Sequence, residues 1–222
     1  MTAWSYSSIK TFDQCPKKFY HLRVAKDVVD EAGPEADYGT KVHEAAELYV
    51  KDGTPIPEKF AYMRPIVESI AAAPGVKYTE MKLGVTKTEA GFAPCGFFDK
   101  NVWWRGVIDV AVVNGHKAHL LDYKTGKSKY ADTKQLDLMA GALFVHNPEV
   151  TTIKSALAFV VVNDFIPKTH ERLHLHKYMG VFDIQLDRLQ AAEESGVWNA
   201  NPGPLCGWCP VNTCEHWRPK RR

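Results

Sequence analysis

Two aspartates and a lysine stand in a segment with the pattern of a β-hairpin, residues 102–126. The segment, "VWWRGVIDVAVVNGHKAHLLDYKTG", is rich in the β-branched and aromatic residues that favour strands. Its Asn114-Gly115 pair is the strongest short signal for a two-residue turn, in which Val113 would face His116. Asp109 then lies opposite Leu120. Because side chains alternate along a strand, Asp109, Asp122 and Lys124 are predicted to share one face.

These charged groups sit among residues that are apolar on both faces of the predicted strands, where an unpartnered charge is costly. One interpretation is an ion pair between Asp122 and Lys124 at a strand end. The other is a divalent metal site, because carboxylate, water and phosphate oxygens suit Mg²⁺ or Mn²⁺. Lys124 would then orient or deprotonate a water molecule, or balance phosphate charge.

Cysteines form the second group with chemical potential. Three of the five lie in "PGPLCGWCPVNTCEHW", at Cys206, Cys209 and Cys214. A disulfide, a redox dithiol, a zinc site and an iron–sulfur cluster are all compatible with clustered thiols. The segment lacks the strand-to-helix setting of a thioredoxin-type dithiol. Zinc bound by the three cysteines and His216 remains one alternative.

The elements that must position these residues are predicted to follow one another along the chain as helices, then strands, then helices. Helical patterns cover residues 5–24, 40–50, 56–75, 133–147 and 181–199, with Thr40 as an N-cap. Strand patterns cover residues 77–89, the hairpin, 152–164 and 172–179, and loops cover 31–39 and 91–96. The predicted fold class is α/β, a mixed central sheet of about four or five strands flanked by helices.

The composition limits the kind of protein that this chain can be. The chain has 222 residues, 45% of them hydrophobic, which suits one sizeable globular domain or two small ones. It contains no apolar run long enough for a membrane span and no pattern of a secretory signal, so a cytoplasmic location is expected. A net charge of +2 neither requires nor excludes nucleic acid, because a local basic groove can form on a nearly neutral chain.

Several segments together resemble one family. The pattern "GVIDVAVVNGHKAHLLDYKTGK" resembles the core of the PD-(D/E)XK nucleases, in particular their RecB-like exonuclease branch. The segments "YSSIKTFDQCPKKFY", "GTKVHEAAE" and "TKQLDLMAGAL" resemble further motifs of that branch in the same order. The terminal "CGWCPVNTC" resembles the cysteines of its iron–sulfur members, such as AddB-type and CRISPR-adaptation nucleases.

The resemblance implies a role for each matching position. His43, Asp109 and Asp122 would be metal ligands, together with the backbone carbonyl of Tyr123. Lys124 would be the catalytic lysine. Gln135 would place DNA beside the site, and Glu80 is a possible additional acid.

The resemblance also implies a restriction-endonuclease-like core in one domain, residues 1–222. Residues 1–75 would form a helical part, 76–180 the catalytic sheet, and 181–222 a C-terminal helix and the cysteines. Cys15 would join Cys206, Cys209 and Cys214 as the fourth ligand of a [4Fe–4S] cluster that ties the two chain ends together.

The function implied is metal-dependent hydrolysis of DNA, as an exonuclease on single-stranded ends in recombination, repair or phage DNA metabolism. The alternative is a non-catalytic DNA-binding subunit with a zinc or iron–sulfur site. Lysines and aromatic residues are candidates to line a basic channel for the strand. They are Lys10, Lys17, Lys18, Lys127, Lys129, Lys134, Trp4, Tyr6 and Trp208.

Overall fold

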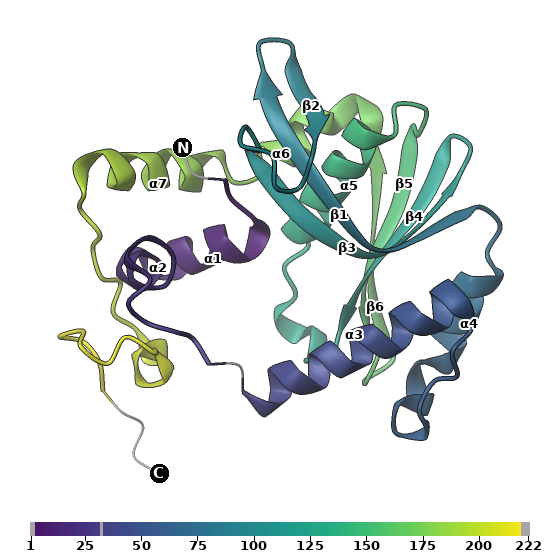
Figure 1. Cartoon of the computed structure of the whole chain (residues 1–222), viewed down its shortest axis with the longest axis horizontal. Coiled ribbons are helices and arrows are strands. Elements are labelled where there is room, and N and C mark those ends of the chain that lie inside the picture. Colours follow the sequence, from purple (N-terminus) through teal and green to yellow (C-terminus); the bar gives the residue numbers. More distant parts are fainter. Residues whose placement is uncertain (1–2, 32, 219–222) are drawn as a thin grey trace. The chain divides into compact units, whose positions relative to one another are not determined.

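A computed structural model of the chain describes residues 3–31 and 33–218. They divide into two compact units, one of residues 34–181 and one drawn from residues 1–33 and 182–222 (Figure 1). We call them the sheet unit and the helical unit and describe each by itself. The organisation of residues 1–222 as one nuclease domain stays a prediction.

The sheet unit is built on a six-stranded mixed sheet with the strand order β2-β1-β3-β4-β5-β6. Strands β4 and β5 are parallel, and the other neighbouring pairs are antiparallel. The predicted α/β class is thereby confirmed. The strands are β1 (Val76–Thr88), β2 (Gly91–Cys95), β3 (Trp104–Asn114), β4 (Lys117–Lys124), β5 (Thr152–Phe159) and β6 (Asp164–Glu171).

The turn of the central hairpin differs from the prediction. Asn114 pairs with Lys117, so the two-residue turn is Gly115-His116. Gly115 has a φ of +56°, and it occupies the first central position, where a type II′ turn favours glycine. The register continues to Val110 opposite Leu121, two residues away from the predicted pairing. An even shift leaves every side chain on its predicted face.

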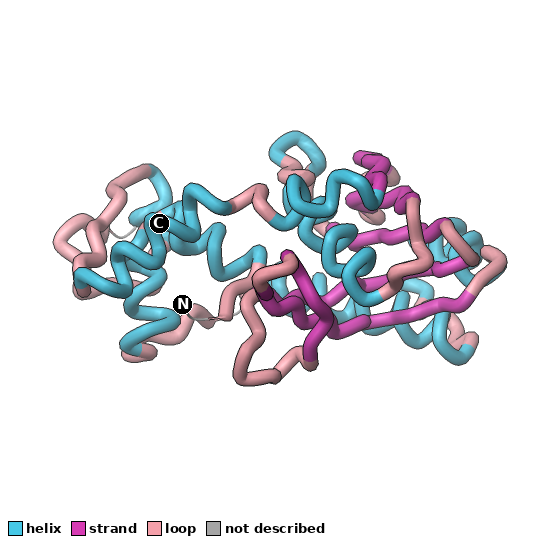
Figure 2. The backbone as a smooth tube through the Cα atoms, turned by 90° about the horizontal axis from the view of Figure 1, so that it is seen from above, coloured by secondary structure: helices cyan, strands magenta, loops and turns pink. Residues whose placement is uncertain are grey.

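Helices cover the sheet on both sides (Figure 2). One side carries α3 (Pro34–Asp52) and α4 (Arg64–Ala72), whose apolar residues share a buried cluster with β3 residues such as Val110 and with Tyr123. The other side carries α5 (Lys134–His146), which packs against α6 (Leu175–Met179). Short 3₁₀ turns cover Glu58–Met63, Ser128–Tyr130 and Arg172–His174.

The sheet has six strands rather than the four or five predicted, because the strand predicted over 152–164 ends at Phe159 and β6 was not predicted. Three further elements also differ from the prediction. Helix α3 begins at Pro34, not at Thr40, because proline suits the first helical turn and acidic side chains there favour the helix dipole. Residues 91–95 form strand β2 rather than a loop. Residues 172–179 form a 3₁₀ turn and helix α6 rather than a strand, because the consecutive residues Tyr178 and Met179 are both buried next to Gly141 of α5, whereas consecutive strand residues would point to opposite faces.

The helical unit begins with a capping box. In α1 (Tyr6–Gln14) the Ser5 hydroxyl accepts a hydrogen bond from the Ser8 backbone N–H, and the Ser8 hydroxyl accepts one from that of Ser5. The predicted break at Pro16 is present, and Cys15 caps the following helix. The other elements are α2 (Pro16–Phe19), a π-helical segment (Tyr20–Ala25), α7 (Asp183–Ser195) and a 3₁₀ turn (Pro204–Trp208).

Aromatic side chains fill the interior of the helical unit. Phe19 stacks on Trp198 with ring centres 5.9 Å apart, and Phe12 meets both rings edge-on.

Throughout the part of the chain that the structure describes, helices are too short or too polar to cross a membrane.

Candidate metal centre and catalytic lysine

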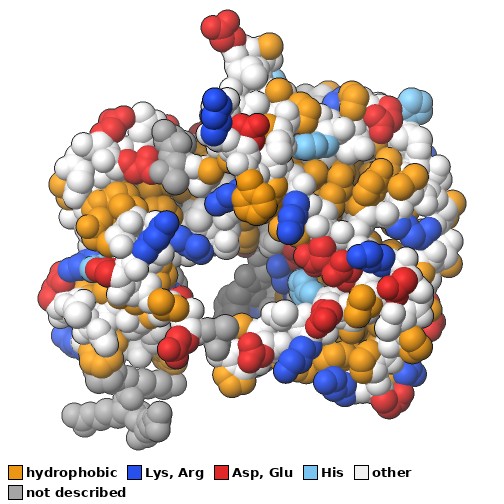
Figure 3. All heavy atoms as spheres, viewed as in Figure 1, with side chains coloured by type: hydrophobic (Ala, Val, Ile, Leu, Met, Phe, Trp, Pro, Cys, Tyr) orange, Lys and Arg blue, Asp and Glu red, His pale blue; other side chains and the backbone are white. Residues whose placement is uncertain are grey.

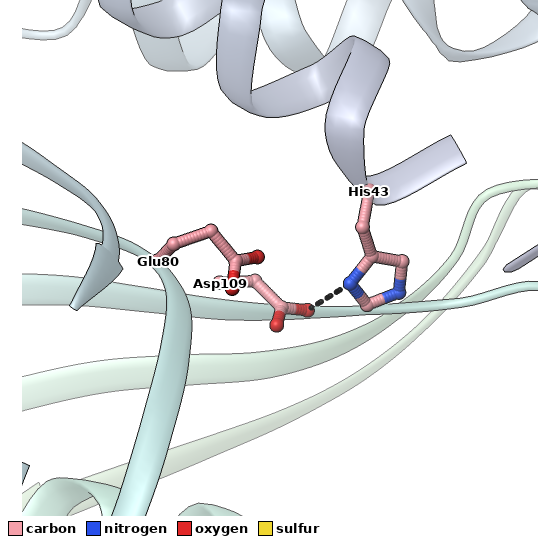
Figure 4. Close-up of side chains that lie close together, drawn as sticks. All are labelled: His43, Glu80 and Asp109. Atoms are coloured by element: carbon pink, nitrogen blue, oxygen red, sulfur yellow. Dashed lines mark ion pairs between the residues drawn. The ribbon is translucent and has the colours of Figure 1, made fainter. Parts of the chain in front are cut away.

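Three side chains from three elements of the sheet unit meet at one point (Figure 4). They are His43 of α3, Glu80 of β1 and Asp109 of β3, and one ligand atom from each lies within 4.8 Å of the others. His43 Nδ1 stands 3.3 Å from Asp109 Oδ2. The family resemblance implied His43 and Asp109 as metal ligands and Glu80 as a possible additional acid, and the packing of α3 on the sheet is what brings the imidazole to the two strands.

Glu80 reaches this point through an unusual backbone conformation. Its φ is +46°, in the left-handed region that costs a non-glycine residue roughly 1–2 kcal/mol. The β1–β3 pairing is interrupted there, between Thr79 opposite Val110 and Met81 opposite Ile108. By register the missing pair is Glu80 with Asp109. The ladder is therefore distorted at the two residues that carry the carboxylates.

The electrostatics of the group favour a cation. Burial raises the pKa of the Glu80 carboxyl, and the charge of Asp109 adds to this. For His43, burial acts to lower the pKa, but the hydrogen bond to Asp109 and the surrounding carboxylates outweigh it and raise the pKa. A cavity of about 470 Å³, lined in part by His43, Glu47 and Glu80, lies beside the group. Acidic and histidine side chains gather on this face (Figure 3).

Asp122 lies next to this group but is held by other partners. It is 2% exposed, and its Oδ1 accepts a 2.6 Å hydrogen bond from Gln135 Nε2. Its Oδ2 is buried without a hydrogen-bond partner but forms an ion pair with the Lys124 ammonium. Burial, reinforced by the charge of Asp109, raises its pKa to about 6. A buried carboxylate oxygen of this kind is a suitable donor for a divalent ion.

The backbone of Tyr123 is tied to the same place. Its N–H donates a 2.7 Å hydrogen bond to Asp109 Oδ2. The N–H and C=O of one strand residue point toward the same neighbouring strand, so the Tyr123 carbonyl also faces β3. The phenol ring is buried and meets His43 edge-on at 5.8 Å.

Lys124 and Gln135 complete the arrangement. The Lys124 ammonium donates a 3.0 Å hydrogen bond to Gln135 Oε1, while the amide nitrogen of Gln135 holds Asp122. One amide thus bridges the lysine and the buried aspartate. The sequence prediction had Gln135 beside DNA and did not foresee this bridge. Lys127, also predicted to bind substrate, lies exposed in the loop after β4.

The oxygen and nitrogen donors fit a hard divalent ion. Two carboxylates and an imidazole converge, a third carboxylate, that of Asp122, lies next to them, and the Tyr123 carbonyl faces β3. Carboxylate and carbonyl oxygens are the donors that Mg²⁺ and Mn²⁺ take in proteins.

The model of one protein family matches residues 3–214, and its description is the PD-(D/E)XK nuclease superfamily. The chain belongs to this superfamily. No curated protein matches. Among solved structures, a candidate exonuclease from Eubacterium rectale shares the fold at 12% identity and a TM-score of 0.52, over 98% of this chain and 88% of that one. The crystal structure of SSO0001 matches at 11% identity and a TM-score of 0.43, with coverage of 98% and 88%.

The nuclease anchors helix α5 by a buried charge network that the sequence prediction missed. Asp137 Oδ1 lies 2.9 Å from His170 Nε2, and its Oδ2 accepts a 2.7 Å hydrogen bond from the Lys168 ammonium. His170 is fully buried. Burial acts to raise the pKa of Asp137, but these two partners outweigh it and lower the pKa. A lone aspartate in the apolar stretch "LDLMAGALF" was the available signal.

Four cysteines of the nuclease line one small cavity in the helical unit. Cys15, Cys206, Cys209 and Cys214 surround it, with His216 at its edge, and its volume is about 30 Å³. The thiols of Cys15 and Cys206 accept backbone hydrogen bonds, for example 3.5 Å from Asn201 N–H to Cys15 Sγ. Cys95 lies in the other unit.

Three of the predicted channel residues of the helical unit contact other residues of that unit. Trp4 is 1% exposed and packs edge-on against Phe182, so its place in a channel was wrong. Lys17 and Lys18 pair with Glu215 and Asp30 at 2.5 and 3.5 Å.

Proposed function

We propose that this PD-(D/E)XK nuclease is a Mg²⁺- or Mn²⁺-dependent exonuclease of the RecB-like branch that degrades single-stranded DNA from an end. The observation that carries the proposal is the convergence of His43, Glu80 and Asp109 beside Lys124. Recombination, repair or phage DNA metabolism is the corresponding process.

His43, Glu80, Asp109, Asp122 and the Tyr123 carbonyl would hold the ion. A bound divalent ion neutralises charge on the phosphate and makes water a better nucleophile. Lys124, held by Gln135, would orient the attacking water or balance the charge that develops on the phosphate. Asp109 keeps its orientation through the Tyr123 N–H.

A non-catalytic DNA-binding subunit is the alternative. Such a protein has no need to keep a buried Asp122 next to a lysine, because the arrangement costs desolvation free energy. The presence of these acids and of the lysine therefore favours a catalytic protein over a non-catalytic subunit.

We also propose that the four cysteines hold a [4Fe–4S] cluster, with a structural role. A single tetrahedral zinc ion needs ligand atoms about 3.8 Å apart, given Zn–S bonds of about 2.3 Å. No three cysteine or histidine ligand atoms around this cavity lie within 4.8 Å of one another among residues 3–31 and 33–218. A [4Fe–4S] cluster is bound by four thiolates, and four cysteines line this cavity.

End-labelled linear DNA, single-stranded and duplex, incubated with Mg²⁺ or Mn²⁺, tests the catalytic proposal. We expect wild type to shorten linear single strands progressively and to leave circular single strands intact. Lys124→Ala should lose at least about 100-fold in rate, as is usual for a positioned acid–base group. Lys154→Ala, an exposed lysine on β5, is the matched control. Equal rates for wild type and Lys124→Ala would reject the proposal.

A further inference from the structure

Beside the metal centre, the sheet unit carries an exposed aromatic and basic surface that none of the proposed catalytic roles uses. It consists of Lys82, Phe97, Phe98 and Arg105, and we call it the Phe98 surface. The Phe98 side chain is 79% exposed, the most exposed large hydrophobic side chain of the described residues. A single exposed hydrophobic side chain is ordinary on a protein surface, but Phe98 lies against a second ring that an arginine also contacts, and this combination is typical of a binding surface.

The Phe98 surface lies on the same side of the sheet as the carboxylates. Lys82 follows Glu80 by two residues on β1, and its charge acts on the Glu80 carboxyl. Gly84 follows by two more, and a side chain there would collide with the Gly96 carbonyl at 2.6 Å. The loop after β2 therefore crosses the sheet on the Glu80 side, about 13 Å along the strand from the carboxylate.

The loop is fixed in place rather than free to collapse. The Asp99 N–H bonds to the Gly96 carbonyl, and the Asp99 side chain accepts from the Asn101 N–H. Thr86 of β1 donates to the Asn101 carbonyl at 2.9 Å. Phe98 is therefore presented by an ordered loop, which lowers the conformational entropy lost on binding.

The Phe98 surface also contains positively charged side chains. Arg105 pairs with Gly84 in the β1–β3 ladder and places its guanidinium 5.5 Å from the centre of the Phe97 ring. Phe97 in turn meets Phe98 edge-on at 4.9 Å. Within the described chain, no carboxylate pairs with Arg105 or with Lys82. In Figure 3 a hydrophobic side chain lies between two Lys or Arg side chains, directly above the acidic and histidine cluster.

We infer that the Phe98 surface binds the single strand that leads into the metal centre, with a base stacked on Phe98 and phosphates paired with Lys82 and Arg105. This inference rests on the proposed function. Every base offers a flat face for stacking on an aromatic ring, so such a surface binds without sequence preference. Bases in a duplex are already stacked on one another, so an exposed ring selects unpaired nucleotides.

Anisotropy of a labelled oligothymidylate in EDTA measures this binding without cleavage. Phe98→Ala should raise the dissociation constant about tenfold, within the range for loss of one stacked base. Phe98→Tyr should restore affinity, and Phe98→Leu should behave like Phe98→Ala, because an aliphatic side chain cannot stack. Phe165→Ala removes an exposed phenylalanine from β6 and is the matched control, with unchanged affinity expected.

The salt dependence of the affinity measures the contribution of the two charged side chains separately from that of the ring. Lys82→Ala and Arg105→Ala should each lower the slope of log affinity against log salt by about 0.7, as expected for one phosphate contact on a single strand.

The outcomes separate this inference from the proposed function. If wild type degrades single strands while Phe98→Ala binds and degrades them equally well, the Phe98 surface is not the strand-binding site and the enzyme assignment stands. If Phe98→Leu keeps full affinity, the surface makes an apolar contact with some other partner, and the stacking inference is overturned. If wild type neither binds nor degrades single strands, both proposals fail.

Discussion

The candidate metal centre of the sheet unit and the cysteine site of the helical unit differ in how their ligands are held. His43, Glu80 and Asp109 project from a 19-residue helix and two central strands, and their ligand atoms are already gathered. The four cysteines project from a helix start and from the short turns of residues 203–214. They surround a common cavity, but their sulfur atoms are not drawn together.

The difference follows from what fixes the backbone. In the sheet unit, ladder hydrogen bonds and a buried core determine where each carboxylate stands, so like charges can be forced together. In the helical unit, the described residues after α7, 196–218, contain only one short 3₁₀ turn. Segments with so little core of their own are commonly stabilised by a bound metal or cluster. The fold of the sheet unit thus positions the ligands of the candidate metal centre, whereas a cluster bound at the cysteine site would itself stabilise the helical unit.

The largest effect is expected at the cysteine site. If the proposed cluster is present, Cys15→Ser should remove it, and the helical unit should lose its compact form, because structural metal sites contribute binding free energy on the order of 10 kcal/mol. Limited proteolysis of residues 183–218 and iron content per chain measure this. Cys95→Ser is the control. Full iron content and unchanged proteolysis in Cys15→Ser would exclude Cys15 as a ligand.

At the candidate metal centre, replacing Asp122, a proposed ligand, should stabilise the metal-free protein, which is the opposite of the effect expected at the cysteine site. The folded pKa of Asp122 is about 6, above its ordinary value of 3.8, so the folded state holds more protons between those values. The free energy of unfolding therefore falls as pH rises from about 4 to 6 and stays low above it. Asp122→Asn should stabilise the metal-free protein at pH 7 by about 1–3 kcal/mol and abolish activity.

Urea unfolding in EDTA at several pH values measures this effect. The difference between wild type and Asp122→Asn should shrink toward pH 4. A difference that is the same at pH 4 and pH 7 would show that charge burial at Asp122 is not its cause.

Asp137 is a second buried aspartate of the sheet unit, and its pKa is shifted in the opposite direction from that of Asp122. The pKa of Asp137 is lowered by His170 and Lys168, so its contribution to stability is present above the ordinary value of 3.8 and is lost as pH falls through the lowered pKa. Asp137→Asn should destabilise the protein by about 1.5–3 kcal/mol, the usual range for hydrogen bonds to a charged group.

The same substitution should also lower activity, because α5 carries Gln135, which holds Lys124. Asp13→Asn, which removes an exposed ion pair with Arg188 in the helical unit, is the control. Its cost should stay below about 1 kcal/mol. If Asp137→Asn costs no more than Asp13→Asn, the network does not anchor α5.

The smallest effect is expected at Glu80. Alanine keeps the strain of a positive φ, whereas glycine relieves it. Glu80→Gly should therefore be about 1 kcal/mol more stable than Glu80→Ala, and both should lose metal affinity. Thermal unfolding and Mn²⁺ titration of the two variants measure this. A Glu80→Gly variant that is less stable than Glu80→Ala would show that the positive φ carries no strain.

The period of two in the strands was enough to predict that Asp109, Asp122 and Lys124 share a face. The prediction survived a turn placed one residue too early, because the resulting register shift was even. The shared cavity of Cys15 with the terminal cysteines also agrees with the family resemblance. Residues 172–179 were mispredicted because alternating leucines and histidines suit a strand locally, while packing of Tyr178 against α5 residues such as Phe144 favours a helix.

The sequence by itself determined the hairpin, its shared face of charged residues and the order of the motifs, because these depend on neighbours along the chain. Only the tertiary structure decided that α3 delivers His43 to Asp109, that Gln135 bridges Lys124 and Asp122, and that Glu80 adopts a positive φ. These contacts join residues 11 to 66 positions apart, and they form only when helices pack on the sheet and bury the groups that must then find partners.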